Sequence, residues 1–293
     1  MDLKEYMTVK NNLIENCLEE LLTKELEIPI IEESMKYSIF AGGKRLRPIL
    51  AIMACELFDG SIEEVLPFSC CIELIHTYSL IHDDLPSMDN DDFRRGKPTN
   101  HKVFGEGFAV LAGDALLNTA YEIMLEYIYK FNKPEYIKAA YVISKAAGVT
   151  GMVGGQYIDL YYENKDITLD ELNQMHDKKT GAMIKASLEI GAIIANAKND
   201  DIKRISLYGQ LIGRAFQIAD DILDIKGSKE KLGKTLGKDA IGDKSTYVSY
   251  YGLEKSIEIA QSTINRAKDI ISVYGNKAKL LYELADYIVN RDS

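Results

Sequence analysis

Residues 62–84 read IEEVLPFSCCIELIHTYSLIHDD, and apolar side chains recur in this stretch at intervals of three and four residues. That spacing is typical of an α-helix with one buried face, because residues three and four apart share a face. Three more stretches carry the same pattern, at residues 107–131, 171–195 and 202–225. Long helices therefore decide the fold, and we predict an all-α chain.

The rest of the chain supports this prediction. Strand-like alternation is not seen in any convincing run, and none of the six prolines lies after Pro134. Helix starts are signalled by possible capping boxes at Ser61–Glu64 and Thr168–Glu171, and helix stops by Asp59-Gly60 and Gly227-Ser228. We expect one domain over residues 1–293, a bundle of about ten helices around a central active-site cavity.

Composition narrows the class of ligand. The chain is 46% hydrophobic and 27% charged with a net charge of −10, which is typical of a soluble globular protein. An acidic surface disfavours nucleic acid as a partner, because phosphate backbones attract basic surfaces. A polyanionic ligand would therefore need clustered cations or a metal ion.

Other features predict a reduced, cytoplasmic protein. The first 22 residues contain no apolar signal core, and the longest uncharged run, residues 146–158, is too short to cross a membrane. We therefore expect no transmembrane segment. The cysteines at positions 17, 55, 70 and 71 have no C-x-x-C spacing, which disfavours a disulfide framework or structural zinc and favours buried thiols.

A cluster of carboxylates follows the first helical stretch. We expect Asp83 and Asp84 to end that helix, Pro86 to break it, and Asp89 to return from the loop. Carboxylates in such a set suit Mg²⁺. A solvated acidic loop remains an alternative, and His82 next to Asp83 also resembles metal phosphohydrolases.

A second cluster lies within the last long helical stretch. Asp220 and Asp224 are four residues apart and share a helix face, with Asp221 beside them and Gln217 one turn earlier. Like charges at that spacing destabilise a helix, and the neighbouring side chains are apolar. The two clusters together could hold several Mg²⁺ ions and a diphosphate.

Basic residues lie in short blocks near both clusters. AGGKRLRP at residues 41–48 contains Lys44, Arg45 and Arg47, while Arg94 and Arg95 follow the first cluster. KKTG at residues 178–181 precedes the second cluster, and three lysines, Lys234, Lys238 and Lys244, follow it. In an acidic chain these blocks indicate two anionic sites, one bridged by metal and one bound directly by arginine and lysine.

These motifs together resemble the trans-isoprenyl diphosphate synthase family. DDLPSMDNDDFRRGKPTNH resembles its first aspartate-rich motif and FQIADDILD its second. GGKRLRP, GMVGGQYIDL, KKTGAMI and GKTLGKDAIGDKSTY match further blocks in the same order. The resemblance spans roughly residues 39–291, and bacterial farnesyl diphosphate synthases are the most similar members.

The resemblance implies an isoprenoid-synthase helical bundle, usually a homodimer, that lengthens an allylic diphosphate with isopentenyl diphosphate. It implies three Mg²⁺ ions, with Mn²⁺ an alternative, held by Asp83, Asp84, Asp89, Asp220, Asp221 and Asp224. It assigns the allylic diphosphate to Arg94, Lys179, Lys234 and Lys244, and the reacting centre to Lys179, Thr180 and Gln217, with these last two also contacting the allylic substrate. It assigns isopentenyl diphosphate to Lys44, Arg47, His76 and Arg95.

The product is expected to be (2E,6E)-farnesyl diphosphate, with fifteen carbons. In the family, residues just before the first motif form a floor under the growing chain, and Tyr78 with Ser79 resembles the farnesyl type. A geranylgeranyl (C20) diphosphate synthase is the main alternative. A terpene cyclase, a phosphohydrolase using His82-Asp83 and a non-catalytic partner subunit are further alternatives.

Overall fold

The computed structural model describes residues 1–23, 28–163, 165–232 and 246–290, with only the backbone of residues 226–232. The described chain is almost entirely helical, so the all-α prediction is confirmed. It divides into two compact units, residues 1–141 with 190–196, and residues 142–189 with 197–293. The single-domain organisation stays a prediction.

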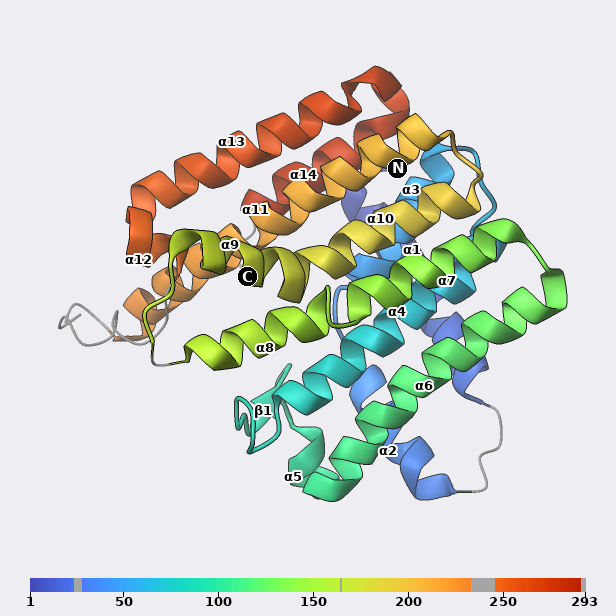
Figure 1. Ribbon diagram of the computed structural model, residues 1–293, viewed down its shortest axis with the longest axis horizontal. Coiled ribbons are helices and arrows are strands. Elements are labelled where there is room, and N and C mark those ends of the chain that lie inside the picture. The colour runs from blue at the N-terminus through green and yellow to red at the C-terminus, as the bar shows by residue number, and fades with distance from the viewer. Residues whose placement is uncertain (24–27, 164, 233–245, 291–293) are drawn as a thin grey trace. The chain divides into compact units, whose positions relative to one another are not determined.

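The first unit contains the N-terminal helices and a small hairpin (Figure 1). Its elements are α1 Leu3–Leu22, α2 Pro29–Ile39, α3 Leu46–Leu57, α4 Ile62–Asp83, β1 Phe93–Arg94, β2 Lys97–Pro98, α5 Asn100–Phe104 and α6 Glu106–Phe131. Helices α7 Pro134–Ala147 and α10 Ala182–Ile194 have residues in both units. The antiparallel β1–β2 pair was not predicted; two residues per strand are too few to produce an alternating pattern.

Helix α4 is the centre of the first unit. It packs along α6 and α3 (Figure 1), and Phe68, Ile72 and Ile75 are at most 1% exposed. Each such side chain contributes about 1.5–3 kcal/mol by leaving water. Among the described residues, α4 and α6 are long and apolar enough to cross a membrane, and the relevant window is 72% buried in α4 and 39% buried in α6.

The second unit is built around one long helix. Its elements are α8 Met152–Tyr162, α9 Leu169–His176, a π-helix Asp177–Gly181, α11 Asn199–Leu232, α12 Tyr247–Tyr251, α13 Leu253–Ile271, a 3₁₀ helix Ser272–Ala278 and α14 Lys279–Asn290. Helix α11 packs against α13, α14 and the π-helix. Its Ile218 and Ile222 join the buried cluster beneath α12 and α13.

Helix boundaries test the local sequence signals. Thr168 and Glu171 form the predicted capping box at the start of α9. Ser61 does precede α4, but its side chain makes no capping hydrogen bond, so that capping-box prediction is wrong. The predicted stop at Gly227-Ser228 is also wrong, since α11 continues to Leu232; one helical glycine costs only about 1 kcal/mol.

Candidate active site

The first aspartate motif lies where α4 ends. Asp83 is the last residue of the helix and Asp84 its C-cap, as predicted from Pro86. The loop then turns back, and the Asp89 backbone N–H donates to the Asp83 carbonyl at 2.8 Å. The fold therefore brings Asp89 back beside the helix end, although it is six residues further along the chain.

The middle aspartate of this motif is bound by an arginine. Arg94 Nε lies 2.7 Å from Asp84 Oδ1 and 2.9 Å from Oδ2, and Asp84 is only 3% exposed. Burial raises the pKa of Asp84 above its usual value, and Arg94 opposes the rise. Asp84 therefore holds the β1 strand that carries Arg94 at the end of α4.

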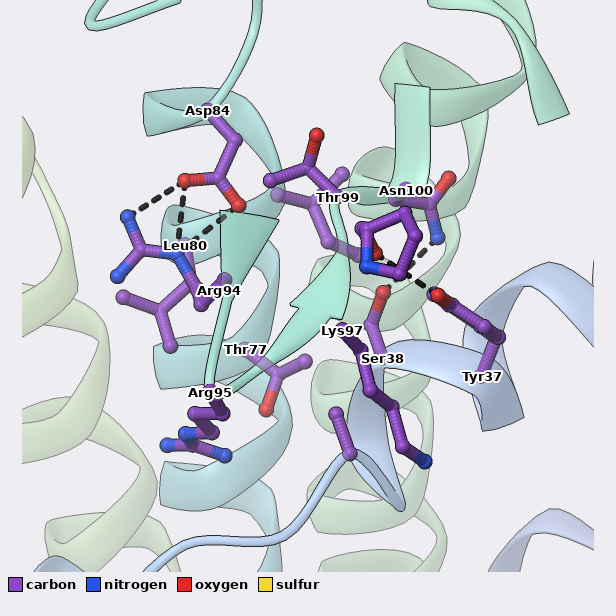
Figure 2. Close-up of a pocket in the computed structure, with 13 residues that line it drawn as sticks. Tyr37, Ser38, Thr77, Leu80, Asp84, Arg94, Arg95, Lys97, Thr99 and Asn100 are labelled. Carbon is purple, nitrogen blue, oxygen red and sulfur yellow. Dashed lines mark hydrogen bonds and ion pairs between the residues drawn. The ribbon is translucent and has the colours of Figure 1, made fainter. Parts of the chain in front are cut away.

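The hairpin is also fixed from its other side. Tyr37 Oη donates to the Pro98 carbonyl at 2.8 Å, and Asn100 Nδ2 donates to the Ser34 carbonyl at 2.9 Å. Figure 2 shows Tyr37 and Asn100 at a pocket that residues of α2, α4 and the hairpin line, Thr77 among them. These hydrogen bonds thus fix the position of the hairpin that carries Arg94 and Arg95.

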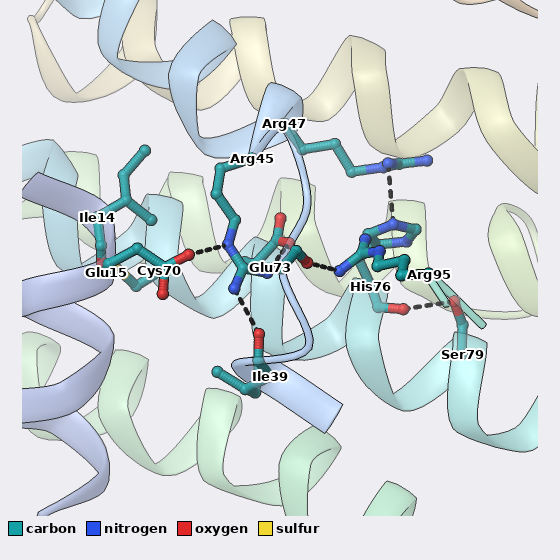
Figure 3. Close-up of polar contacts among 11 residues, drawn as sticks. Ile14, Glu15, Ile39, Arg45, Arg47, Cys70, Glu73, His76, Ser79 and Arg95 are labelled. Atoms are coloured by element: carbon teal, nitrogen blue, oxygen red, sulfur yellow. Dashed lines mark hydrogen bonds and ion pairs between the residues drawn. The ribbon is translucent and has the colours of Figure 1, made fainter. Parts of the chain in front are cut away.

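The basic residues of the first unit form a second constellation (Figure 3). Arg47 Nη1 lies 3.2 Å from His76 Nε2, and Arg95 donates to the Gly42 carbonyl. A Cβ on Gly43 would lie 2.7 Å from the Arg95 guanidinium, so only glycine allows this approach. The structure thus brings Arg47, His76 and Arg95 together, with Lys44 exposed on the same loop.

His76 is neutral in this arrangement. A guanidinium can only donate hydrogen bonds, so Nε2 of His76 must accept from Arg47. Burial and the positive charge of Arg47 hold the pKa of His76 well below its usual value. A neutral imidazole leaves Nδ1–H on the other side of the ring.

The predicted floor residues lie on α4, one to two turns before Asp83. Tyr78 is 6% exposed, its ring meets His82 edge-on at 5.6 Å, and burial raises its pKa to about 12. Ser79 Oγ donates to the His76 carbonyl at 2.8 Å. Tyr78 is thus a packed aromatic, while Ser79 is partly exposed.

His82 has a structural setting. Its Nε2 lies 3.0 Å from the Val110 carbonyl of α6, and a Cβ on Gly113 would lie 2.2 Å from the same nitrogen. A ring nitrogen that donates to a backbone carbonyl cannot also ligate a metal. This contact therefore leaves Nδ1 as the ring nitrogen that could meet a metal in the phosphohydrolase alternative based on His82-Asp83.

The second motif belongs to the second unit and uses other donors. Asp221 is 5% exposed and accepts the Tyr247 backbone N–H at 2.9 Å and Gln217 Nε2 at 3.3 Å. Thr180 Oγ1 in turn donates to Gln217 Oε1 at 3.1 Å. Burial raises the pKa of Asp221 to about 6, against the effect of both hydrogen bonds. The structure thus links the predicted residues Thr180, Gln217 and Asp221.

Lys179 and Thr180 lie on a π-helix, an irregularity that is often found at functional sites. Lys179 Nζ is 2.6 Å from Asp159 Oδ2 of α8. A Cβ on Gly155 would lie 2.1 Å from the Lys179 backbone nitrogen, so glycine lets α8 support this turn. GMVGGQYIDL therefore places Asp159 and Gly155 against the KKTG block.

Two predicted residues, Lys234 and Lys244, lie outside the described residues. One residue with a site contact was missed, Tyr247, which holds Asp221 through its backbone and whose hydroxyl donates to Asn173. It stands in the quoted KSTY block, but nothing in the sequence indicates a role for its backbone N–H. The roles of all the predicted site residues stay predictions.

The aspartates have the chemistry that Mg²⁺ requires. In the described part of the chain, no three acidic, histidine or cysteine side chains gather at a position that could hold a metal ion. Mg²⁺ commonly takes one or two carboxylates together with waters and substrate phosphates, so a protein cage of three ligands is not needed. The carboxylates of Asp83, Asp89, Asp220 and Asp224 fit that mode.

Comparison with known proteins agrees with these observations. The polyprenyl synthetase family model matches residues 28–284. A geranylgeranyl diphosphate synthase of Cyanophora paradoxa is 46% identical, over 98% of this chain and 96% of its own length. A farnesyl diphosphate synthase of Bacillus subtilis is 43% identical, over 99% and 98%.

Solved structures give the same result. An FPP/GFPP synthase from Zymomonas mobilis superposes with a TM-score of 0.87 at 39% identity, over 98% of each chain. A geranyltransferase from Legionella pneumophila has a TM-score of 0.89 at 33% identity, over 99% of this chain and 97% of its own. The chain belongs to the polyprenyl synthetase family.

Proposed function

We propose that this protein is a Mg²⁺-dependent prenyltransferase. It condenses isopentenyl diphosphate with dimethylallyl diphosphate and then with the resulting geranyl diphosphate, giving (2E,6E)-farnesyl diphosphate and releasing one diphosphate in each round. The observation that carries this proposal is the pair of aspartate motifs: in each, protein donors hold the middle carboxylate in place between two further aspartates. Family membership and the separate basic constellation support it.

Both aspartate motifs would supply ligands to about three Mg²⁺ ions, as the family resemblance implies. Asp83, Asp89, Asp220 and Asp224 would ligate directly, with Asp84 and Asp221 fixing their surroundings. When bound, the metal would supply positive charge that stabilises the departing diphosphate.

The cationic side chains complete the binding of the allylic substrate. Its diphosphate would be bound by Arg94, Lys179, Lys234 and Lys244. The ion pair with Asp159 would hold the Lys179 ammonium group in place for this contact. Thr180 and Gln217, already hydrogen-bonded to each other, would line the reacting carbon.

Isopentenyl diphosphate would bind to Lys44, Arg47, His76 and Arg95. These residues would hold its double bond close to the allylic carbon, so that the carbocation formed by C–O cleavage is attacked at once. No motif side chain is an obvious base for the final proton, which would pass to the released diphosphate. The site must exclude water, which would otherwise capture the carbocation.

A fifteen-carbon product is proposed from Tyr78 and Ser79. Overall similarity does not decide product length, since the similar relatives carry names with different products. Tyr78 is packed one to two turns before Asp83, and there its ring would stop the growing chain, as the family resemblance implies. The 46% identical geranylgeranyl diphosphate synthase favours a twenty-carbon product as the second candidate.

We also infer a cytoplasmic homodimer. Helix α6 exposes two apolar pairs, Phe108 with Leu111 and Leu125 with Tyr129, on either side of the polar Asn118 and Glu122. Exposed apolar surface of this kind suits a second copy of the chain. Sedimentation velocity should give twice the chain mass, and Leu111→Glu with Leu125→Glu should give monomers.

The test of the reaction is release of diphosphate with each substrate alone and with both. A prenyltransferase should release it only when Mg²⁺, dimethylallyl diphosphate and isopentenyl diphosphate are all present. Release from the allylic substrate alone would favour a cyclase, and phosphate from many esters a phosphohydrolase. No turnover by the purified chain would favour the non-catalytic partner subunit.

A further inference from the structure

Arg45 differs from the other basic residues of its block. Lys44 is exposed and Arg47 partly exposed, whereas the Arg45 side chain is completely buried. A buried guanidinium loses its hydration and is tolerated only where carboxylates and hydrogen bonds replace the water. The buried Arg45 side chain therefore cannot contact a substrate diphosphate, so Arg45 must have a role other than direct binding.

Three helices meet at this guanidinium (Figure 3). Arg45 Nε donates to Glu15 of α1 at 2.7 Å, Nη1 donates to Glu73 of α4 at 2.7 Å, and Nη2 donates to the Ile39 carbonyl at the end of α2. The Glu73 side chain is itself only 2% exposed. Burial lowers the pKa of Arg45, but the two carboxylates raise it by more, so the group stays charged.

The backbone of Arg45 is in an unfavourable conformation. Its φ of 46° and ψ of 38° lie in the left-handed region, which residues with a Cβ rarely adopt, and it is the N-cap of α3 without a side-chain cap. Such a conformation persists only where surrounding contacts fix it. Here the contacts are the three hydrogen bonds of the buried guanidinium.

That conformation sets the positions of the neighbouring cations. Arg45 directly follows Lys44, and Arg47 lies two residues later in the first turn of α3. The preceding Gly42 and Gly43 also have positive φ, and such residues add flexibility rather than rigidity. The loop is thus fixed from the α3 side, where Arg45 is anchored.

We propose that Arg45, through Glu15 and Glu73, is a positioning residue that holds Lys44 and Arg47 in place for the diphosphate of isopentenyl diphosphate. This rests on the proposed function of that site. Arg45 does not touch the substrate. Its loss would let the loop relax to an ordinary backbone conformation and move both cations away from His76 and Arg95.

The experiment compares Michaelis constants for the two substrates in Arg45→Met and Arg45→Lys. We expect the KM for isopentenyl diphosphate to rise about tenfold or more in Arg45→Met, because small displacements of binding groups weaken binding strongly. The KM of Arg45→Lys for isopentenyl diphosphate should lie between those of the wild type and Arg45→Met. Lysine keeps the positive charge but cannot reproduce the three hydrogen bonds of the guanidinium. The KM for the allylic substrate should stay within about twofold.

The matched control is Lys10→Met. Lys10 is another buried cation of the same unit, bonded to Glu56 of α3 at 2.7 Å, but remote in sequence from the basic block. It should lower the melting temperature without changing either KM. A tenfold rise for both substrates in Arg45→Met, or an unchanged KM for isopentenyl diphosphate, would overturn the proposal.

Two further measurements keep the test decisive. If Arg45→Met does not fold, Glu15→Gln removes one partially exposed carboxylate and should raise the same KM about threefold. An unchanged KM in Glu15→Gln would then count against the proposal. If the wild type makes no prenyl product, the proposed function fails, and calorimetric binding of isopentenyl diphosphate to wild type and variant tests the positioning role directly.

Discussion

The two aspartate motifs hold their middle carboxylates in different ways. In the first unit Asp84 is bound by the charged side chain of Arg94, across a hairpin. In the second unit Asp221 is bound by neutral groups, the Tyr247 backbone N–H and Gln217. The first motif therefore depends on an ion pair and the second on backbone geometry. Each arrangement fixes the middle of its aspartate motif.

The largest effect should follow loss of an outer aspartate in either motif. Asp83→Ala and Asp220→Ala should each lower kcat/KM about 10³-fold, because charge stabilisation at the departing diphosphate is lost. Steady-state assays would measure this, with the exposed Asp200→Ala of α11 as control. If one of the two variants kept wild-type activity, the motifs would not act in one reaction.

A packing change behind the second motif should have the next largest effect. Gly155→Ala places a Cβ 2.1 Å from the Lys179 backbone nitrogen, so the π-helix must shift. We expect a loss of about 1–3 kcal/mol in the free energy of unfolding, with reduced kcat. The control Gly107→Ala, at a glycine of α6 with no atom within 4 Å, should be neutral or slightly stabilising. Equal stability of the two variants in urea would contradict the close packing.

Neutralising the two middle aspartates tests the comparison itself. Asp84→Asn leaves Arg94 without its carboxylate and should cost about 2 kcal/mol, less than a fully buried pair because Arg94 is partly exposed. Asp221→Asn can still accept the Tyr247 N–H and removes a buried charge, so its change should stay within about 1 kcal/mol. Urea unfolding at pH 7 measures both. The reverse order would show that the first motif does not depend on its ion pair.

Product length should belong to the first unit alone. Tyr78→Ala should shift the product toward longer chains by opening space beneath the first motif, without loss of condensation. Tyr250→Ala, at an exposed tyrosine of the second unit, is the control. Product masses identify the change, and identical profiles for wild type and Tyr78→Ala would exclude Tyr78 as the floor.

The smallest effects concern two histidines with lowered pKa values, His76 in the first unit and His176 in the second. Burial and Arg47 lower the pKa of His76, and burial lowers that of His176 to about 4. As pH falls below 6.5, the unfolded chain binds these protons while the folded chain does not. Stability should therefore decline from pH 6.5 downward, and less so in His76→Phe and His176→Phe. Histidine NMR titration checks this: a pKa near 6.5 for His76 would exclude the Arg47 contact.

Much of this arrangement could be predicted from the sequence, because it depends on local signals. Apolar spacing predicted the helices, and Pro86 predicted the break that returns Asp89 to Asp83. The capping box at Ser61 does not form, and the Glu64 side chain that would complete it binds Lys133 at 2.6 Å. A residue 69 positions away leaves no mark on the local pattern.

The basic block shows the same limit. Nothing in the local sequence shows which of the three cations Lys44, Arg45 and Arg47 is buried. Arg45 is the buried one because Glu15 and Glu73 lie where its guanidinium can reach them. Likewise, the support that Asp221 receives from the Tyr247 N–H is a backbone property. The residue types in a motif predict its chemistry, whereas tertiary packing decides which of several similar side chains carries out each role.

The most direct test of the account is the mass of the product formed from Mg²⁺, dimethylallyl diphosphate and isopentenyl diphosphate. We expect a fifteen-carbon diphosphate from the wild-type protein and none from Asp83→Ala or Asp220→Ala. A twenty-carbon product would keep the reaction but contradict the floor assigned to Tyr78. If the wild-type protein formed no condensation product, the proposed prenyltransferase activity would be contradicted.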